Sequence, residues 1–223
     1  MTALDATADA QPPVEEAAAP AAVTGPLAGD PAMLGLPSFI VGSVALGLGL
    51  VGAVPAGVLG APVAIILAAT SVGLLLAAVW SLAIGQSAVA GVFGIFGTFW
   101  LSYAVLVLGL DHNWFAIAPV AVLATVKLFL LTWLIVIVML TLATLRLPLA
   151  FTGVFALIDV ALLLLYIAFA QASPAGLPSN GLMTTAGVVV LAFAAIGVYL
   201  FFSSASVATG GKPLPLGKPV LGG

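Results

Sequence analysis

Six apolar stretches, each long enough to cross a lipid bilayer, occupy nearly all of the chain after residue 37. A helix needs about 20 residues to cross a hydrocarbon core that is roughly 30 Å thick. Charged residues make up 5% of the sequence and hydrophobic residues 64%, which is too little polarity for a water-soluble surface. The sequence therefore predicts a membrane protein with spans at residues 39–54, 62–84, 89–110, 115–142, 149–170 and 182–203.

The predicted fold class is all-α, with the six transmembrane helices in one bundle. The apolar runs lack strand alternation and are longer than the roughly 10-residue strands of a membrane barrel. Lipid also requires every backbone group to be hydrogen-bonded internally, as it is in a helix. We expect one six-helix transmembrane domain at residues 30–206 between two tails at residues 1–29 and 207–223. The first tail is rich in Ala, Pro and acids, so it is predicted to be disordered.

The few basic residues predict the orientation of the bundle. Arg146, Lys212 and Lys218 fall on the same side as the N-terminus when six spans are counted, and the opposite connections carry no Lys or Arg. Basic residues favour the cytoplasmic side. We therefore expect a multi-pass protein of the plasma or inner membrane, with both termini in the cytoplasm and the lipid bilayer around it.

Catalytic and metal-binding motifs are missing from the sequence. The chain contains no cysteine, which removes disulfides, thiolate ligands and cysteine nucleophiles together. His112 follows Asp111, and with Trp114 nearby this pair is interpreted as a solvated loop with an interfacial anchor. We expect no enzyme activity, no catalytic residue, no cofactor and no metal site. The net charge of −3 also implies no nucleic-acid partner.

The segment at residues 30–39 combines an acid, three prolines or glycines and the first large aromatic residue. Asp30 before Pro31 is typical of a helix N-terminus. Gly35 and Pro37 predict a short turn, after which the first spanning helix would restart. A helix start at the membrane surface suits an anion, although an ordinary cap explains the same residues.

The third span carries two stripes with a spacing of three residues. Its glycines are Gly91, Gly94 and Gly97, and its phenylalanines are Phe93, Phe96 and Phe99, followed by Trp100. Small residues on one face let a neighbouring helix approach closely. On spacing alone, packing is favoured over a pore lining.

Taken in order, these pieces resemble the acetate uptake transporter family, which includes bacterial succinate–acetate permeases and fungal acetate and ammonium export proteins. The family's Asn-Pro-Ala-Pro-Leu-Gly-Leu signature appears at residues 30–36. Its third-helix pattern of Gly-Asn-Thr and Tyr-Gly-x-Phe-Trp-Leu appears at residues 85–87 and 96–101. Tyr199 in the last helix and a Leu-Pro-x-Gly tail at residues 214–217 also match, so the resemblance covers residues 30–219.

The resemblance implies a six-helix protomer that assembles as a homo-hexamer, with one substrate path through each protomer. The family's apolar gate of Phe, Tyr and Leu corresponds here to Phe39, Phe96 and Leu157. Its signature places Asp30, Pro31, Leu34 and Gly35 at the substrate mouth. Two departures stand out: Phe96 lacks the tyrosine hydroxyl, and Asp30 puts a negative charge where the family has a neutral amide. That charge would repel acetate unless it is screened or protonated.

Two charged residues, Lys127 and Asp159, fall inside predicted spans. An isolated charge costs about 2.5 to 3.5 kcal/mol on insertion scales, so each needs an explanation. Counting from the connection near Arg146 predicts a height difference of roughly 9 Å between them. There are three interpretations: an ion pair, direct or linked by water; a role toward substrate or protons; and a lysine that reaches the membrane surface.

The predicted function is a transporter or channel for small monocarboxylates, with acetate first and succinate as a further substrate. The flux would be passive or proton-coupled. Ammonium or another small neutral solute is the alternative within transport, because the gate is apolar throughout. A membrane scaffold that transports nothing is the alternative from another class.

Overall fold

The computed structural model describes residues 25, 28–54, 60–172 and 180–222. Apart from residues 25, 28 and 29, the predicted disordered tail at 1–29 lies outside the described residues. All regular structure in the described part is helical, and six helices are long and apolar enough to cross a membrane. The prediction of six helical spans is therefore confirmed. The helices are α1 (Ala32–Leu50), α2 (Ala61–Ile65), α3 (Val72–Ala83), α4 (Ser87–Asp111), α5 (Val122–Ala143), α6 (Leu149–Ala170) and α7 (Asn180–Ala208).

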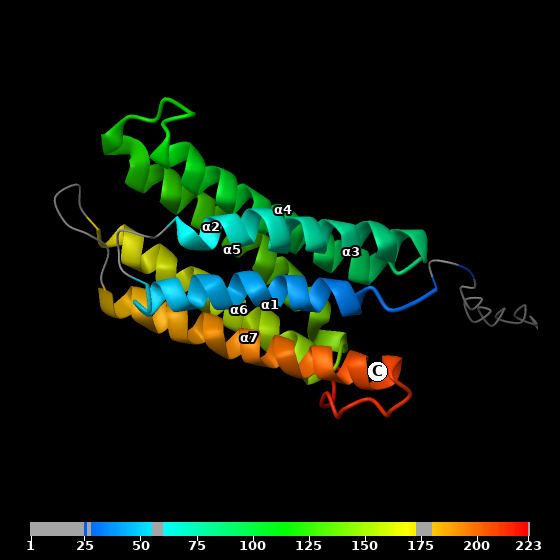
Figure 1. Cartoon of the computed structure of the whole chain (residues 1–223). Helices are drawn as coiled ribbons and strands as arrows, with labels where there is room; N and C mark the ends of the chain where they lie inside the picture. The colour runs from blue at the N-terminus through cyan, green and yellow to red at the C-terminus, as the bar shows by residue number, and fades with distance from the viewer. Residues whose placement is uncertain (1–24, 26–27, 55–59, 173–179, 223) are drawn as a thin grey trace, which may run out of the picture.

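The spans form a ring in which each packs against its neighbours (Figure 1). α5 packs on α6, α6 on α7, α7 on α1, α1 on α3 and α3 on α4. A π-helical turn at Ile66–Ser71 joins α2 and α3 into one span. The ring closes between α4 and α5, whose backbones make few close approaches and are bridged by aromatic side chains such as Phe99 and Trp133.

The start of α1 differs from the prediction. The helix begins at Ala32 and continues through Pro37 without the expected turn. Gly35 lies against the ring of Phe93, so its missing side chain serves close packing and not a bend. Neighbouring helices make proline tolerable inside a membrane helix. Asp30 does act at the helix start, where its carboxylate accepts a hydrogen bond of 2.9 Å from the Ala32 N–H.

The C-terminal segment at residues 212–222 folds back onto one end of the bundle. The Tyr199 hydroxyl donates to the Pro215 carbonyl at 2.8 Å, and the Ala150 N–H donates to the Leu216 carbonyl at 2.9 Å. The segment therefore satisfies one of the free N–H groups at the start of α6. We call this end, where α1 begins and α7 ends, the proximal end, and the opposite end the distal end (Figure 1).

Close approach of α1 and α7 depends on Gly187. A methyl group built at this glycine would lie 2.7 Å from the Leu50 Cβ atom and 3.0 Å from the Val51 backbone nitrogen. Backbone atoms cannot rotate away as a side-chain tip can, so the two helices would have to separate.

We predict that Gly187→Ala destabilises the protein by about 1 to 3 kcal/mol, the usual cost of overpacking. Thermal unfolding in detergent measures this. Gly91→Ala is the matched control, because a methyl group there meets no atom within 4 Å and alanine is the better helix former. Equal melting temperatures for the two variants would contradict the packing argument.

Candidate functional site: two cavities divided by an aromatic pair

Two cavities lie inside the ring of helices, one toward each end. The proximal cavity has a volume of about 580 Å³ and the distal cavity about 190 Å³. Among the described residues, Phe39 and Phe96 are the two that line both. This aromatic pair therefore separates two chambers, one toward each end of the bundle.

The dividing pair is part of a cluster of four phenylalanines from four helices. The rings of Phe39 and Phe96 meet edge to face with centroids 5.3 Å apart. Phe193 of α7 lies 5.7 Å from Phe39, and Phe155 of α6 lies 5.6 Å from Phe96. All four side chains are buried. The cluster brings together two of the three residues predicted as a gate.

Leu157, the third predicted gate residue, lies elsewhere. It is partly buried against the core and does not line either cavity in the described part of the chain. Phe155, two residues earlier, occupies the expected place. Two residues correspond to about 200° around a helix, which turns a side chain to nearly the opposite face. The connection after Arg146 has no motif of fixed spacing, so the sequence does not determine which residue of α6 faces the gate. The signal that could have identified Phe155 is that it is an aromatic residue near the start of α6.

The proximal cavity has a polar rim. Its lining includes Asp30, Ser87, Thr144, Ser203 and Ser204, together with Leu216 of the C-terminal segment. The Thr144 hydroxyl donates to the Thr141 carbonyl, and the Ser203 hydroxyl accepts from the Leu214 N–H. Of the four residues predicted at the substrate mouth, Asp30 alone lines this cavity in the described part of the chain. The other three stand apart from it: Pro31 is buried, Leu34 is partly exposed and Gly35 packs on Phe93.

The negative charge of Asp30 is partly offset by its position. The carboxylate accepts a hydrogen bond from the first turn of α1, where the helix dipole places positive charge. The helix start therefore offsets part of the repulsion that the Asp30 carboxylate would exert on a nearby anion.

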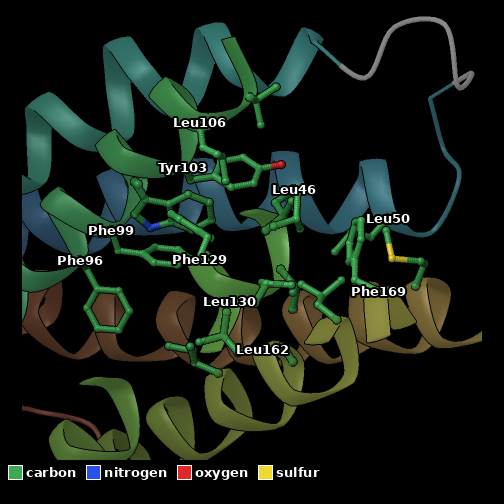
Figure 2. A pocket seen from close by; sticks show the side chains of 18 of the residues that line it. Leu46, Leu50, Phe96, Phe99, Tyr103, Leu106, Phe129, Leu130, Leu162 and Phe169 are labelled. Carbon is green, nitrogen blue, oxygen red and sulfur yellow. The ribbon is translucent and has the colours of Figure 1, made fainter. Parts of the chain in front are cut away.

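The distal cavity is almost entirely apolar (Figure 2). Leucines and phenylalanines of α1, α4, α5 and α6 surround it, including Leu46, Phe129 and Leu162. Tyr103 of α4 lies beside Leu46 and Leu106 and brings one hydroxyl to this wall. Phe39 and Phe96 line its proximal side, where the two chambers meet.

Asp159 pairs with a hydroxyl and not with a lysine. Its Oδ2 atom accepts a hydrogen bond of 2.6 Å from the Thr141 hydroxyl of α5, while its Oδ1 atom is buried and has no partner. Within the described residues, Asp159 forms no ion pair with Lys127. Of the three interpretations of these charges, direct pairing is therefore wrong.

The offset between Lys127 and Asp159 explains why they do not meet. Thr141 marks the level of Asp159 on α5, and Lys127 lies 14 residues away along that helix, or roughly 21 Å. The sequence estimate of 9 Å assumed that α5 and α6 begin level at their connection. Instead α6 extends past the end of α5. Lys127 lies less than two turns from the distal end of α5, within reach of the membrane surface for a lysine side chain.

Six candidate spans arranged around two internal chambers define a multi-pass membrane protein. The profile of the GPR1/FUN34/yaaH family matches residues 16–211. The chain belongs to this family, which confirms the resemblance to acetate uptake transporters.

Two individual proteins are similar to this chain. The meiotically up-regulated gene 86 protein of Schizosaccharomyces pombe is 36% identical over 118 residues, which are 51% of this chain and 37% of that protein. The match thus spans little more than a third of the relative's length. The solved structure of the bacterial acetate channel SatP has a TM-score of 0.72 at 23% identity and covers 85% of this chain and 99% of the channel chain. This second likeness shows a shared fold.

We predict that Thr141 and Asp159 are energetically coupled and that Lys127 and Asp159 are not. Thr141→Val should cost about 1 to 3 kcal/mol, because it removes the donor to a partly buried carboxylate whose other oxygen has no partner. In unfolding measurements, Thr141→Val combined with Asp159→Leu should depart from additivity by at least about 0.5 kcal/mol. Lys127→Met combined with Asp159→Leu should be additive.

Thr125→Val is the matched control for this cycle. Thr125 is also on α5, but its hydroxyl donates to the Ala121 carbonyl of its own helix. Coupling of Asp159 to Lys127 in place of Thr141 would contradict the arrangement.

Proposed function

We propose that the protein is a membrane pathway for small monocarboxylates, acetate first, and that the flux is passive or proton-coupled. One observation carries the proposal: two chambers inside one protomer meet at the Phe39 and Phe96 pair. The family assignment and the fold shared with a bacterial acetate channel support it.

The chemistry of the two chambers suits a small acid with an apolar methyl group. The hydroxyls of Ser87, Ser203 and Ser204 around the proximal cavity can solvate a carboxylate. The aromatic pair then presents a dry constriction, which the neutral acid crosses at lower cost than the anion because a bare charge is expensive to desolvate. Flux should accordingly rise at mildly acidic pH, where more acetate is protonated.

Ammonium or another small neutral solute remains the alternative within transport, and the apolar constriction would admit it. Competition distinguishes the two: ammonium should leave labelled acetate flux unchanged, and propionate or succinate should reduce it. The non-transporting scaffold is less well supported, because it gives no reason for two chambers aligned through the bundle.

The direct experiment is uptake of labelled acetate into liposomes that contain the purified protein. We expect faster uptake than in protein-free liposomes, with a further increase when the external pH is lowered. If the protein does not increase the rate of acetate uptake under either an acetate gradient or a pH gradient, the proposal is wrong.

We further propose a cytoplasmic proximal end, a plasma or inner membrane location and a homo-hexamer with one path in each subunit. Arg146 and the C-terminal lysines gather at the proximal end, as the positive-inside rule favours. A detergent-corrected mass near that of a monomer would argue against the hexamer, and external labelling of a C-terminal tag in intact cells would argue against the orientation.

We predict that Phe39→Ala or Phe96→Ala joins the two chambers and relaxes size selectivity. Butyrate and longer acids should enter severalfold faster relative to acetate, because an aromatic constriction selects by size and by dewetting. Parallel uptake of acetate and butyrate measures the ratio.

Phe202→Ala provides the control for this change, since Phe202 is 59% exposed on α7 and lines neither chamber in the described chain. Burial of Phe39 and Phe96 makes a loss of about 3 to 5 kcal/mol expected, so the folded fraction must be measured beside the flux. Folded variants with the selectivity of the parent protein would show that the pair only packs.

A further inference from the structure

The distal cavity contains two polar side chains in an otherwise apolar wall. Of the described residues that line it, Trp100 and Tyr103 are those with a side-chain nitrogen or oxygen atom. Both belong to α4 and are three residues apart, so they lie on the same face of the helix. Their ring centroids are 6.2 Å apart in an edge-to-face arrangement.

Trp100 presents a buried donor that the protein leaves unpaired. The side chain is 2% exposed, and its indole Nε1 atom has no hydrogen-bond partner. Buried tryptophan nitrogens usually find an acceptor, because an unpaired buried donor destabilises the fold. Packing with Phe99 at 5.1 Å explains the position of the ring but not the unpaired nitrogen.

Tyr103 offers a second donor beside the first. No hydrogen bond joins its hydroxyl to another described residue, although the ring packs against Trp100 and Phe129. The hydroxyl in Figure 2 belongs to the wall formed with Leu46 and Leu106. Phenylalanine would pack equally well in such a wall, so the hydroxyl calls for another explanation.

The volume of the cavity suits a small organic molecule. Its 190 Å³ exceeds the roughly 150 Å³ of an engineered apolar cavity that binds benzene and otherwise stays dry. An acetic or propionic acid molecule fits within this volume. Its methyl end matches the leucine and phenylalanine wall, and its carboxyl oxygens match two unpaired donors.

We propose that Trp100 and Tyr103 form a carboxyl-binding station in the distal chamber. The indole N–H and the phenol O–H donate hydrogen bonds to the oxygens of a small monocarboxylic acid that has crossed the Phe39 and Phe96 pair. This inference rests on the proposed function and deepens it, because it assigns a substrate-binding site in the distal chamber.

The same two residues discriminate against ammonium. An ammonium ion has only donors and requires acceptors, preferably carboxylates. In the described lining of the distal chamber, Tyr103 supplies a lone hydroxyl oxygen and carboxylates are absent. The station therefore favours a carboxylic acid over the alternative substrate.

The test compares Trp100→Phe and Tyr103→Phe with the same substitutions outside the chamber. Trp133→Phe and Tyr166→Phe are the matched controls, because both residues are partly buried and line neither chamber among the described residues. Each variant is reconstituted in liposomes, and uptake of labelled acetate is measured over a range of concentrations. We expect the half-saturating acetate concentration to rise about fivefold or more in the two chamber variants, as for loss of one hydrogen bond. The controls should stay within about twofold of the parent.

The possible outcomes separate the station from the pathway. If the parent protein saturates with acetate and both folded chamber variants match it, the donors are satisfied by water and the station is wrong. An equal rise in the controls, or parent uptake that never saturates, also overturns it while leaving the pathway intact. If the parent shows no acetate uptake, the proposed function fails first. If one of the two chamber variants misfolds, the acetate uptake of the other variant tests the station by itself.

Discussion

The contact between Phe39 and Phe96 links α1 to α4 across the bundle, and the division of the interior depends on it. Neighbouring helices pack along the ring, whereas these two helices make few other backbone approaches. The edge-to-face geometry at 5.3 Å suits the charge distribution of aromatic rings. Phe155 and Phe193 support the pair from the opposite side, so the constriction is held by four helices. The separation of the two chambers follows from this single cluster.

Polarity along the path is sparse because most hydroxyls in the spans are occupied locally. Ser38, Ser43 and Ser81 each donate to the carbonyl four residues earlier in their own helix. Thr70, in the π-helical turn, is an exception whose buried oxygen has no partner. Unpaired donors in a chamber wall are therefore unusual in this protein, and Trp100 gains significance from that contrast.

The sequence predicts spans, family and the Phe39 and Phe96 pair because bilayer thickness and a motif of fixed spacing determine them. It does not predict which residues of two neighbouring helices lie at the same level, because that depends on the axial offset between the helices. The level of Asp159 against α5 depends on where α6 starts relative to the end of α5, and Thr141 becomes its partner only through that offset. Pro37 likewise suggests a break from local rules, yet packing of Gly35 on Phe93 keeps α1 continuous. Local chemistry was interpreted correctly at Asp30, where no distant element takes part.

The C-terminal segment shows why a short motif after the last helix has a structural role. Gly217 adopts a φ of +81°, which glycine tolerates easily, and its Cα region lies close to Leu149 at the start of α6. The preceding Leu216 lines the proximal cavity while its carbonyl accepts the Ala150 N–H. Without the segment, that N–H would lack a partner, so a motif that follows the last helix completes the start of an earlier helix.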